Sequence, residues 1–334
     1  MTPAELSRTV LRTVRRAVEA EELSVPVQGA WQEQLVVQRP PRPGHGDYAT
    51  NVALKLAGPA GRPARQVAEI LRRHLAQAPG IARVEIAEPG FLNITLDAVS
   101  YADLLRTVSQ KGPEYGHGDG LHTVRVTATG ATGPADARAA LTAEVVNRLL
   151  AAAGAGPGEP ENVTVHPVGE PLPDLLRALG PDAARWALLR PPAWDPPQLD
   201  PAVHLAQRAS NPLFRVRYAH ARTRALLRNA HDLGVGTEPG EYRHPAETEL
   251  LGLIADFPRV VEAAARHRAP DRVARHAERA ADAFFRFHDE CPVLPKGEEK
   301  PSAVHGARLA LAEAAGTVLA NGLTLLGISA PDHL

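Results

Sequence analysis

The sequence predicts three parts, which are an α+β domain, a short α/β segment and an all-α helix bundle, over residues 1–110, 111–195 and 196–334. Near the N-terminus, residues 81–86 and 91–96 alternate apolar and polar side chains, as half-buried strands do. From about residue 200 onward, apolar residues recur at three- and four-residue spacing, which is typical of packed helices. Glycine-rich and proline-rich stretches at 111–120 and 191–197 separate the three parts.

The first part is expected to begin with an amphipathic helix and to end with a hairpin. In order, we predict a helix, a strand, two helices and a pair of strands, at 3–22, 34–38, 48–56, 63–77 and 81–96. Asp47 can cap the helix at 48–56, because a carboxylate accepts hydrogen bonds from the first backbone amides of a helix. The turn of the hairpin lies at Glu88-Pro89-Gly90.

The second and third parts are predicted to be mostly helical. In the second part we expect a strand, a helix, a strand and a kinked helix, at 124–128, 135–153, 162–167 and 173–189. Gly180-Pro181 interrupts the last of these helices. In the third part we expect five helices, at 201–209, 212–233, 245–266, 271–290 and 302–327.

Composition excludes several classes of protein. The chain has 334 residues, 44% of them apolar and 22% charged, with a formal net charge of −1. No apolar run approaches the roughly 18 residues of a membrane span, so we expect no membrane partner and a cytoplasmic location. The single cysteine, Cys291, allows no disulfide framework and no cysteine-based metal site. We expect neither a metal nor a cofactor.

A run of uncompensated arginines is the strongest signal for RNA. No acidic residue occurs between Asp200 and Asp232, whereas six arginines do, at 208, 215, 217, 222, 224 and 228. On a helix, Arg215 and Arg222 share one stripe, and Arg217, Arg224 and Arg228 share another. A basic stripe beside aromatic residues is typical of an RNA-binding surface. The alternative is an arginine face that is only solvated.

Aromatic residues near this stripe, and the cap of its helix, complete the pattern. Tyr218 lies on a face suited either to the bundle core or to a stacked base. Asn211 can cap the helix, with Pro212 in its first turn. Phe284, Phe285 and Phe287 are expected in the core.

The second strand of the hairpin carries another candidate contact. Phe91 and Asn93 project from the same face because side chains alternate along a strand. If Leu92 packs inward, a ring and an amide are both presented to solvent, where a base can stack on the ring and the amide can bind a base edge. The alternative is that Phe91 belongs to the core and Asn93 stabilises the turn.

Five segments in the same order resemble arginyl-tRNA synthetases. They lie at residues 44–54, 89–93, 180–189, 211–222 and 318–331. The resemblance implies an α+β N-terminal appended domain that recognises the D loop of tRNA, a short α/β remnant of a nucleotide-binding fold, and an all-α anticodon-binding helix bundle.

The resemblance also implies roles for individual residues. The residues implied to bind tRNA are Tyr48, Phe91, Asn93, Asn211, Arg215, Tyr218, Arg222 and Arg224. Phe91 and Asn93 are assigned to the D loop, and the residues from 211 onward to the anticodon arm. Two positions depart from the family: His288 stands where a tyrosine is common, and Leu334 where a methionine is usual. These departures put fine recognition of the anticodon loop in doubt.

The middle of the chain lacks the family's catalytic motifs. The family uses a histidine-x-glycine-histidine motif and a lysine-methionine-serine-lysine loop to stabilise phosphate charge on ATP. Here no histidine lies between His122 and His166, no lysine between Lys111 and Lys296, and the only methionine is Met1. Gly180 follows Pro134 by only 46 positions, too few for the several βαβ units of a doubly wound fold. We therefore predict no catalytic residue.

The middle of the chain has two smaller features. The glycine-rich loop at 129–133 either cradles a phosphate or is only a turn between a strand and a helix. Asp136 and Arg138 are expected to be solvated helix residues, and His166 a surface residue.

The sequence thus favours a non-catalytic, arginyl-tRNA synthetase-like protein that binds arginine tRNA through both ends. A first alternative is arginine–tRNA ligase activity, from this chain alone or with a partner that supplies the missing catalytic part. A second is a protein-interaction subunit of a full-length synthetase. A gene product without a role is the third.

Overall fold

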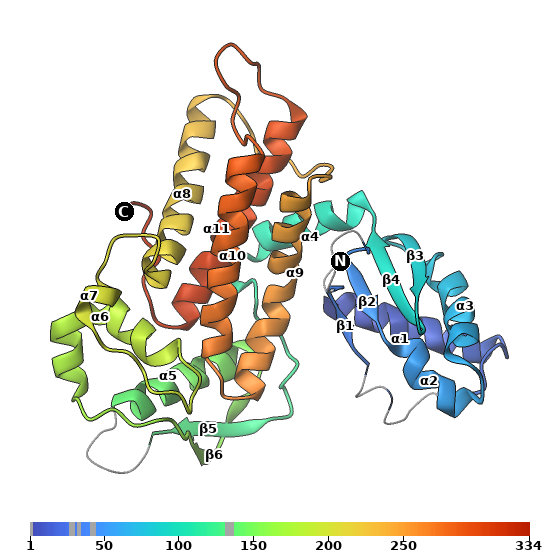
Figure 1. Cartoon of the computed structure of the whole chain (residues 1–334), viewed down its shortest axis with the longest axis horizontal. Helices are drawn as coiled ribbons and strands as arrows, with labels where there is room; N and C mark the ends of the chain where they lie inside the picture. Colours follow the sequence, from blue (N-terminus) through green and yellow to red (C-terminus); the bar gives the residue numbers. More distant parts are fainter. Residues whose placement is uncertain (1–2, 27–30, 32–34, 41–44, 131–136) are drawn as a thin grey trace. The chain divides into compact units, whose positions relative to one another are not determined.

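The computed structural model describes residues 3–26, 31, 35–40, 45–130 and 137–334. These residues form two compact units (Figure 1). Unit 1 extends to Leu104 and includes residues 240–242, and unit 2 contains 105–239 and 243–334. Parts of the predicted strand at 34–38 and of the loop at 129–133 lie outside the described residues, as does Asp136.

Unit 1 is a four-stranded antiparallel sheet with helices. Its elements are α1 (Pro3–Glu19), β1 (Val37–Gln38), β2 (Tyr48–Thr50), α2 (Val52–Ala60), α3 (Ala64–Leu75), β3 (Ile81–Ala87), β4 (Phe91–Leu96) and the first half of α4 (Ala98–Lys111). The strand order is β1-β2-β4-β3. The predicted hairpin is confirmed as β3 and β4, which pair from Ile81 with Leu96 to Ala87 with Phe91.

The helix predicted at 48–56 is wrong at its start. Residues 48–50 form β2, in which Tyr48 pairs with Ile94 of β4, and the helix begins only at Val52. Asp47 caps no helix, and its carboxylate instead accepts a hydrogen bond from the backbone amide of Leu96 at 2.7 Å. Pairing with β4 satisfies the backbone groups of both strands, so tertiary contact overrides the local helical pattern.

Unit 2 holds the remaining elements. They are the second half of α4, the short 3₁₀ helix Gly112–Glu114, β5 (Arg125–Thr129), α5 (Ala137–Ala152), β6 (Gly156–Asn162), α6 (Leu172–Leu189), α7 (Pro201–His204), α8 (Pro212–Asp232), α9 (Pro245–Arg266), α10 (Asp271–Glu290) and α11 (Ala303–Leu325). The prediction of α8 to α11 is confirmed to within about two residues at each end. Their apolar spacing was long and regular, which is the most dependable sequence signal.

Helices α8, α9, α10 and α11 lie side by side as a bundle (Figure 1). Phe257, Phe284 and Phe287 are fully buried in its core. Gly316 on α11 lets the backbone approach α8 closely, because a Cβ there would overlap the hydroxyl of Thr223. In the described part of the chain, no helix combines the length and apolar character needed to cross a membrane.

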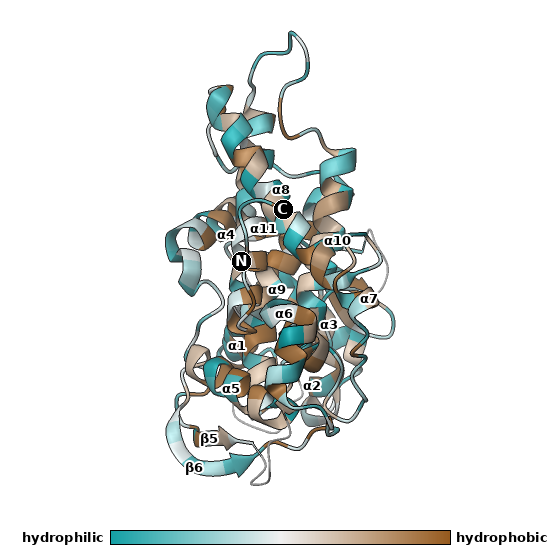
Figure 2. Cartoon of the chain, turned by 90° about the vertical axis from the view of Figure 1, so that its left-hand side faces the viewer, coloured by the Kyte–Doolittle hydropathy of each residue, from teal (hydrophilic) through white to brown (hydrophobic). Residues whose placement is uncertain are grey.

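The middle of the chain forms one βαβ arrangement. β5 and β6 pair in parallel, and α5 connects them. The second strand lies at 156–162, before the predicted 162–167, and its sequence is hydrophilic (Figure 2). Its side chains are mostly exposed, so this strand is defined by its backbone pairing with β5 and not by an apolar pattern. For this reason the sequence did not indicate its correct position. The predicted break in α6 is confirmed, because Gly180 adopts φ 73°.

Arg138 on α5 is buried, with 1% of its surface exposed, which contradicts the prediction of a solvated residue. Its guanidinium donates to five backbone carbonyls, at distances from 2.6 to 3.3 Å. These carbonyls belong to His166, Leu188, Pro191, Pro192 and Asp195. The charged side chain of Arg138, which the sequence suggested to be solvated, thus holds the loop after α6 against α5.

Candidate nucleic-acid interface

The sheet of unit 1 presents Phe91 and Asn93 on the same face. Asn93 pairs with Ala49 of β2 and Glu85 of β3, and Leu92 alternates onto the opposite face, where it is fully buried. Phe91 is half-buried. Asn93 is only 7% exposed, so the expectation that its amide is presented to solvent beside the ring is wrong. β4 is a central strand, with β2 and β3 on either side of it.

A cavity of about 470 Å³ opens beside Phe91. Gln38, Lys55 and Phe91 are among its lining residues, and all of them belong to unit 1. An aromatic ring, an amide and an exposed ammonium group together can stack a base, bind its edge and neutralise a phosphate. The sequence alone did not indicate Gln38 or Lys55, because strand pairing brings Gln38 towards Phe91 and the packing of α2 against β4 brings Lys55 there.

Tyr48 lies in the core of unit 1 and not in this cavity. It pairs with Ile94, which places both side chains on the buried face of the sheet, and Tyr48 is 2% exposed. A side chain this buried has no surface for a direct contact. The predicted contact between Tyr48 and RNA is therefore not supported by its position.

In unit 2, a row of aromatic rings joins α8 to α10. Tyr218 stacks between Phe214 and Phe285, with ring centroids 5.8 Å apart on each side. Tyr218 is 44% exposed and Phe285 is half-buried. Phe284 and Phe287 lie in the core as predicted, but Phe285 does not, because it points towards α8 at the surface. Part of this aromatic row, mainly the ring of Tyr218, is therefore accessible to solvent.

Two arginines of the first stripe flank this row. The guanidinium of Arg215 lies 5.3 Å from the ring centroid of Phe285 and also pairs with Asp282 at 2.6 Å. The Nε of Arg222 donates to Nε2 of His288 at 3.3 Å. Within the described residues, Arg222 has no carboxylate partner. We call Arg215, Tyr218, Arg222 and Phe285 the α8 surface.

The second arginine stripe is covered by the C-terminal segment. Arg224 pairs with the Asp332 carboxylate at 3.0 Å, and Arg228 donates to the Asp332 carbonyl at 3.4 Å. Arg217 donates to the hydroxyl of Ser329 at 3.2 Å and lies 3.6 Å from the Asp182 carboxylate. The sequence suggested uncompensated arginines, but carboxylates far away in the sequence pair with three of the six, which are Arg215, Arg217 and Arg224.

His220 holds the C-terminal segment from the buried side of α8. Its Nδ1 lies 2.9 Å from the carbonyl of Pro331, so the neutral ring donates a hydrogen bond there. Burial lowers the pKa of His220, although this hydrogen bond opposes the shift. A neutral His220 therefore fixes the segment next to Asp332.

Asn211 is a structural residue. It is 3% exposed, and its side-chain oxygen accepts from the amides of Leu213 and Phe214, which confirms the predicted cap of α8. Its amide nitrogen donates to the carbonyls of His204 and Ala206. Every hydrogen-bonding group of this amide is thus used internally, and direct contact of Asn211 with RNA is not supported.

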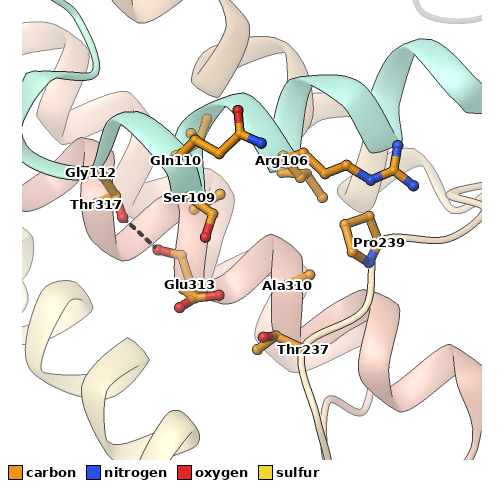
Figure 3. A pocket seen from close by; sticks show the side chains of 12 residues that line it. Arg106, Ser109, Gln110, Gly112, Thr237, Pro239, Ala310, Glu313 and Thr317 are labelled. Carbon is orange, nitrogen blue, oxygen red and sulfur yellow. Dashed lines mark hydrogen bonds between the residues drawn. The ribbon is translucent and has the colours of Figure 1, made fainter.

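Another cavity, of about 450 Å³, lies between α4 and α11 (Figure 3). Ser109 and Gln110 line it from α4, and Glu313 and Thr317 line it from α11. The Thr317 hydroxyl donates to the carbonyl of Glu313 at 3.2 Å. No aromatic side chain lines this cavity, so it lacks the stacking chemistry of the other two sites.

Together, the fold and these surfaces define a modular protein that joins a small α+β unit to a helical bundle with a basic, aromatic face. Residues 5–96 match the family model described as the arginyl tRNA synthetase N terminal domain. Residues 216–334 match the model described as the DALR anticodon binding domain. The chain is 28% identical to the arginine–tRNA ligases of Frankia alni and Renibacterium salmoninarum, in alignments of 556 and 550 residues that cover all of each chain.

Solved structures agree with this assignment. The fold is similar to that of the Thermus thermophilus arginyl-tRNA synthetase, with a TM-score of 0.63 at 14% identity and full coverage of both chains. For the Plasmodium falciparum enzyme, the TM-score is 0.66 at 9% identity, with 99% of both chains covered. The chain belongs to the arginyl-tRNA synthetase family, and it carries the family's N-terminal and anticodon-binding domains.

Proposed function

We propose that this protein binds arginine tRNA without aminoacylating it. One observation carries the proposal: family domains match both ends of the chain, whereas Gly180 follows Pro134 by only 46 positions, which leaves no room for an ATP site. In the proposed division of labour, residues 1–110 bind the D loop, 196–334 bind the anticodon arm, and 111–195 are a vestige of the nucleotide-binding fold.

Two further facts support the loss of catalysis. The alignment with the Frankia protein contains 222 positions that hold no residue of this chain. The described middle consists of β5, α5 and β6, followed by α6. Removing one preorganised electrostatic donor typically costs about 2.7–4 kcal/mol of transition-state stabilisation. Because both cationic motifs are missing from the sequence, adenylate formation should be lost entirely.

Two surfaces support RNA binding. The α8 surface combines an exposed ring with the guanidinium groups of Arg215 and Arg222, and planar cations bind phosphate oxygens well. The cavity beside Phe91 adds a second ring with a nearby ammonium group. Binding would leave most of the core unchanged, because both sites lie on preformed helices and strands.

A titration with arginine tRNA tests the binding. We expect binding at low salt, with the logarithm of the affinity falling against the logarithm of salt at a slope of about −3.5 to −4.5 if about five phosphates are neutralised. Replacing Arg215 and Arg222 by glutamine should flatten this slope. Failure of the pure protein to bind arginine tRNA at low salt would eliminate the proposal.

A separate assay tests the absence of catalysis. Arginine-dependent exchange of pyrophosphate into ATP, with tRNA present, should stay at background. Turnover by the pure chain would instead establish an arginine–tRNA ligase, and turnover only after addition of a second protein would point to a split enzyme. Co-purification with a full-length synthetase, combined with no affinity for tRNA, would favour an interaction subunit.

A further inference from the structure

The exposed face of α1 in unit 1 carries four arginines between an exposed glutamate at each end, Glu5 and Glu19. Arg8, Arg12, Arg15 and Arg16 are all exposed, whereas Leu6, Val10 and Val14 are buried on the opposite side of the helix. With a rise of about 1.5 Å per residue, the row from Arg8 to Arg16 extends about 12 Å. The apolar side of α1 is already used in the core, so only this charged face is available.

These arginines differ from several others in unit 1. Arg65, Arg72 and Arg83 pair with Glu88, Glu69 and Glu85, at 2.9 to 3.1 Å. By contrast, within the described residues no carboxylate pairs with any of the four arginines of α1. Among the described residues, the one side-chain hydrogen bond of this row runs from Arg12 to the hydroxyl of Thr9, at 3.1 Å.

The arrangement carries a cost for the isolated protein. Arg8 and Arg12, like Arg12 and Arg16, are four residues apart, and like charges at this spacing repel each other and destabilise a helix. Elsewhere in unit 1, the same cost is avoided by an acidic partner. An anionic ligand would remove the repulsion.

A groove of about 650 Å³ runs along the row. Its wall opposite the arginines is formed by Ala78 and Pro79, in the turn between α3 and β3. Glu5 lies at the start of the groove and is its only acidic lining residue among those described. No residue lines both this groove and the cavity beside Phe91, so the two sites are separate.

We infer that the groove along α1 binds the phosphate backbone of an RNA strand, at Arg8, Arg12, Arg15 and Arg16. Among the described residues no aromatic side chain lines the groove, so these residues would contact phosphates without reading bases. The inference rests on the proposed function only for the identity of the RNA. A guanidinium group binds phosphate oxygens through two parallel hydrogen bonds, and such contacts are independent of sequence.

The test compares two triple variants of the full chain. Arg8→Gln, Arg12→Gln and Arg16→Gln remove charge from the groove, and glutamine keeps the helical propensity. Arg65→Gln, Arg72→Gln and Arg83→Gln form the matched control, because they remove the same charge from paired, exposed arginines in the same unit. Each protein is titrated against arginine tRNA and against an unstructured 20-nucleotide RNA over a range of salt concentrations.

We expect the α1 variant to reduce the salt slope by about 2 on both RNAs, because each phosphate contact contributes about 0.7–0.9. The control variant should keep the wild-type slope. If the wild type binds tRNA and the α1 variant keeps both affinity and slope, the inference is wrong and the proposed function stands. If only the 20-nucleotide RNA binds, through α1, the proposed function fails and the inference stands.

The remaining outcomes are also decisive. Failure of the wild type to bind either RNA overturns both proposals. A poly-glutamate peptide serves as a competing probe: if it binds through α1 while the RNA slopes do not change, the groove accepts acidic protein and the inference is overturned. Circular dichroism and thermal melting of both variants verify that α1 still folds.

Discussion

The ring of Tyr218 on α8 lies 5.8 Å from the ring of Phe285 on α10, centroid to centroid, with an angle of 23° between the ring planes. The two residues are 67 positions apart in the sequence, yet they form one surface. The guanidinium group of Arg215 lies over the ring of Phe285 and so belongs to the same surface. A stacked base and its phosphate therefore have adjacent partners on two helices.

The first prediction concerns this stack. Tyr218→Ala should weaken binding of arginine tRNA by about 5- to 150-fold, because stacking contributes about 1–3 kcal/mol per base. Tyr218→Phe keeps the ring and should bind within about twofold of the wild type. Neither change removes a cation, so the salt slope should stay constant. Equal affinities of the alanine variant and the wild type, measured by fluorescence titration, would contradict a stacking role.

The second prediction tests whether both units hold the same RNA. Phe91→Ala should weaken tRNA binding without changing the salt slope, because Phe91 is a ring beside a cavity and not a phosphate ligand. The double variant with Tyr218→Ala should bind tRNA more weakly than the wild type by the product of the two single-variant fold changes. Free-energy changes at distant sites with no shared partner residue add. A double variant no weaker than either single variant would show that the two sites do not act on one tRNA.

The third prediction concerns the C-terminal segment. Asp332→Asn should free the guanidinium of Arg224 and raise affinity for tRNA by up to about fivefold, because an exposed ion pair contributes about 0–1 kcal/mol. The salt slope should become steeper. Asp174→Asn, which disturbs the exposed pair with Arg177 on α6, is the control. If the Asp332 variant binds more weakly than wild type, the segment supports binding instead of competing with it.

The fourth prediction concerns the buried Arg138. Arg138→Ala leaves five backbone carbonyls without their donor and should reduce the free energy of unfolding by about 3 kcal/mol or more. Arg138→Lys should recover only part of the loss, because a single ammonium group cannot reach the positions that the guanidinium fork reaches. Arg177→Ala on the exposed side of α6 should change stability by less than about 0.5 kcal/mol. Urea unfolding, followed by tryptophan fluorescence, measures all three.

The fifth prediction is a pH dependence. Burial, together with the charge of Arg279, lowers the pKa of His276 to about 3. In the unfolded chain, His276 takes up a proton near pH 6.5, but in the folded chain it does so only near pH 3. The unfolded state therefore binds more protons between these values, and stability falls as the pH drops.

Between pH 7 and pH 5, His276 should account for about 2 kcal/mol of lost stability. His276→Leu should remove this part of the pH dependence, whereas His117→Gln at an exposed position should not. Chemical unfolding at both pH values measures the difference. An unchanged pH dependence in the leucine variant would mean that His276 takes up its proton without unfolding.

Much of the fold followed from local pattern. The helices of the bundle and the β3–β4 hairpin have regular periodicity, and the structure confirms them. The sequence predicted a helix where β2 lies and placed β6 at 162–167, because both strands are defined by backbone pairing with strands that lie elsewhere in the sequence. For the candidate surfaces, the sequence indicated Arg215, Tyr218 and Phe91, but it could not identify Phe285 or Lys55 as their neighbours.

The sequence by itself determined the helices, the stripes of arginine on α8 and the absence of the family's catalytic motifs, because each depends on residue type and spacing along the chain. Only the tertiary structure decided which of these residues are exposed and free of internal partners, and so could contact a ligand. It buried Tyr48, Asn211 and Arg138, where packing and hydrogen bonds use the whole side chain. It also brought Asp332 to one arginine stripe and Asp282 to Arg215 of the other, so that in the described part of the chain Arg222 keeps no carboxylate partner beside the aromatic row. Charge compensation acts through space, so it cannot be read from a stretch of sequence that contains no acidic residue.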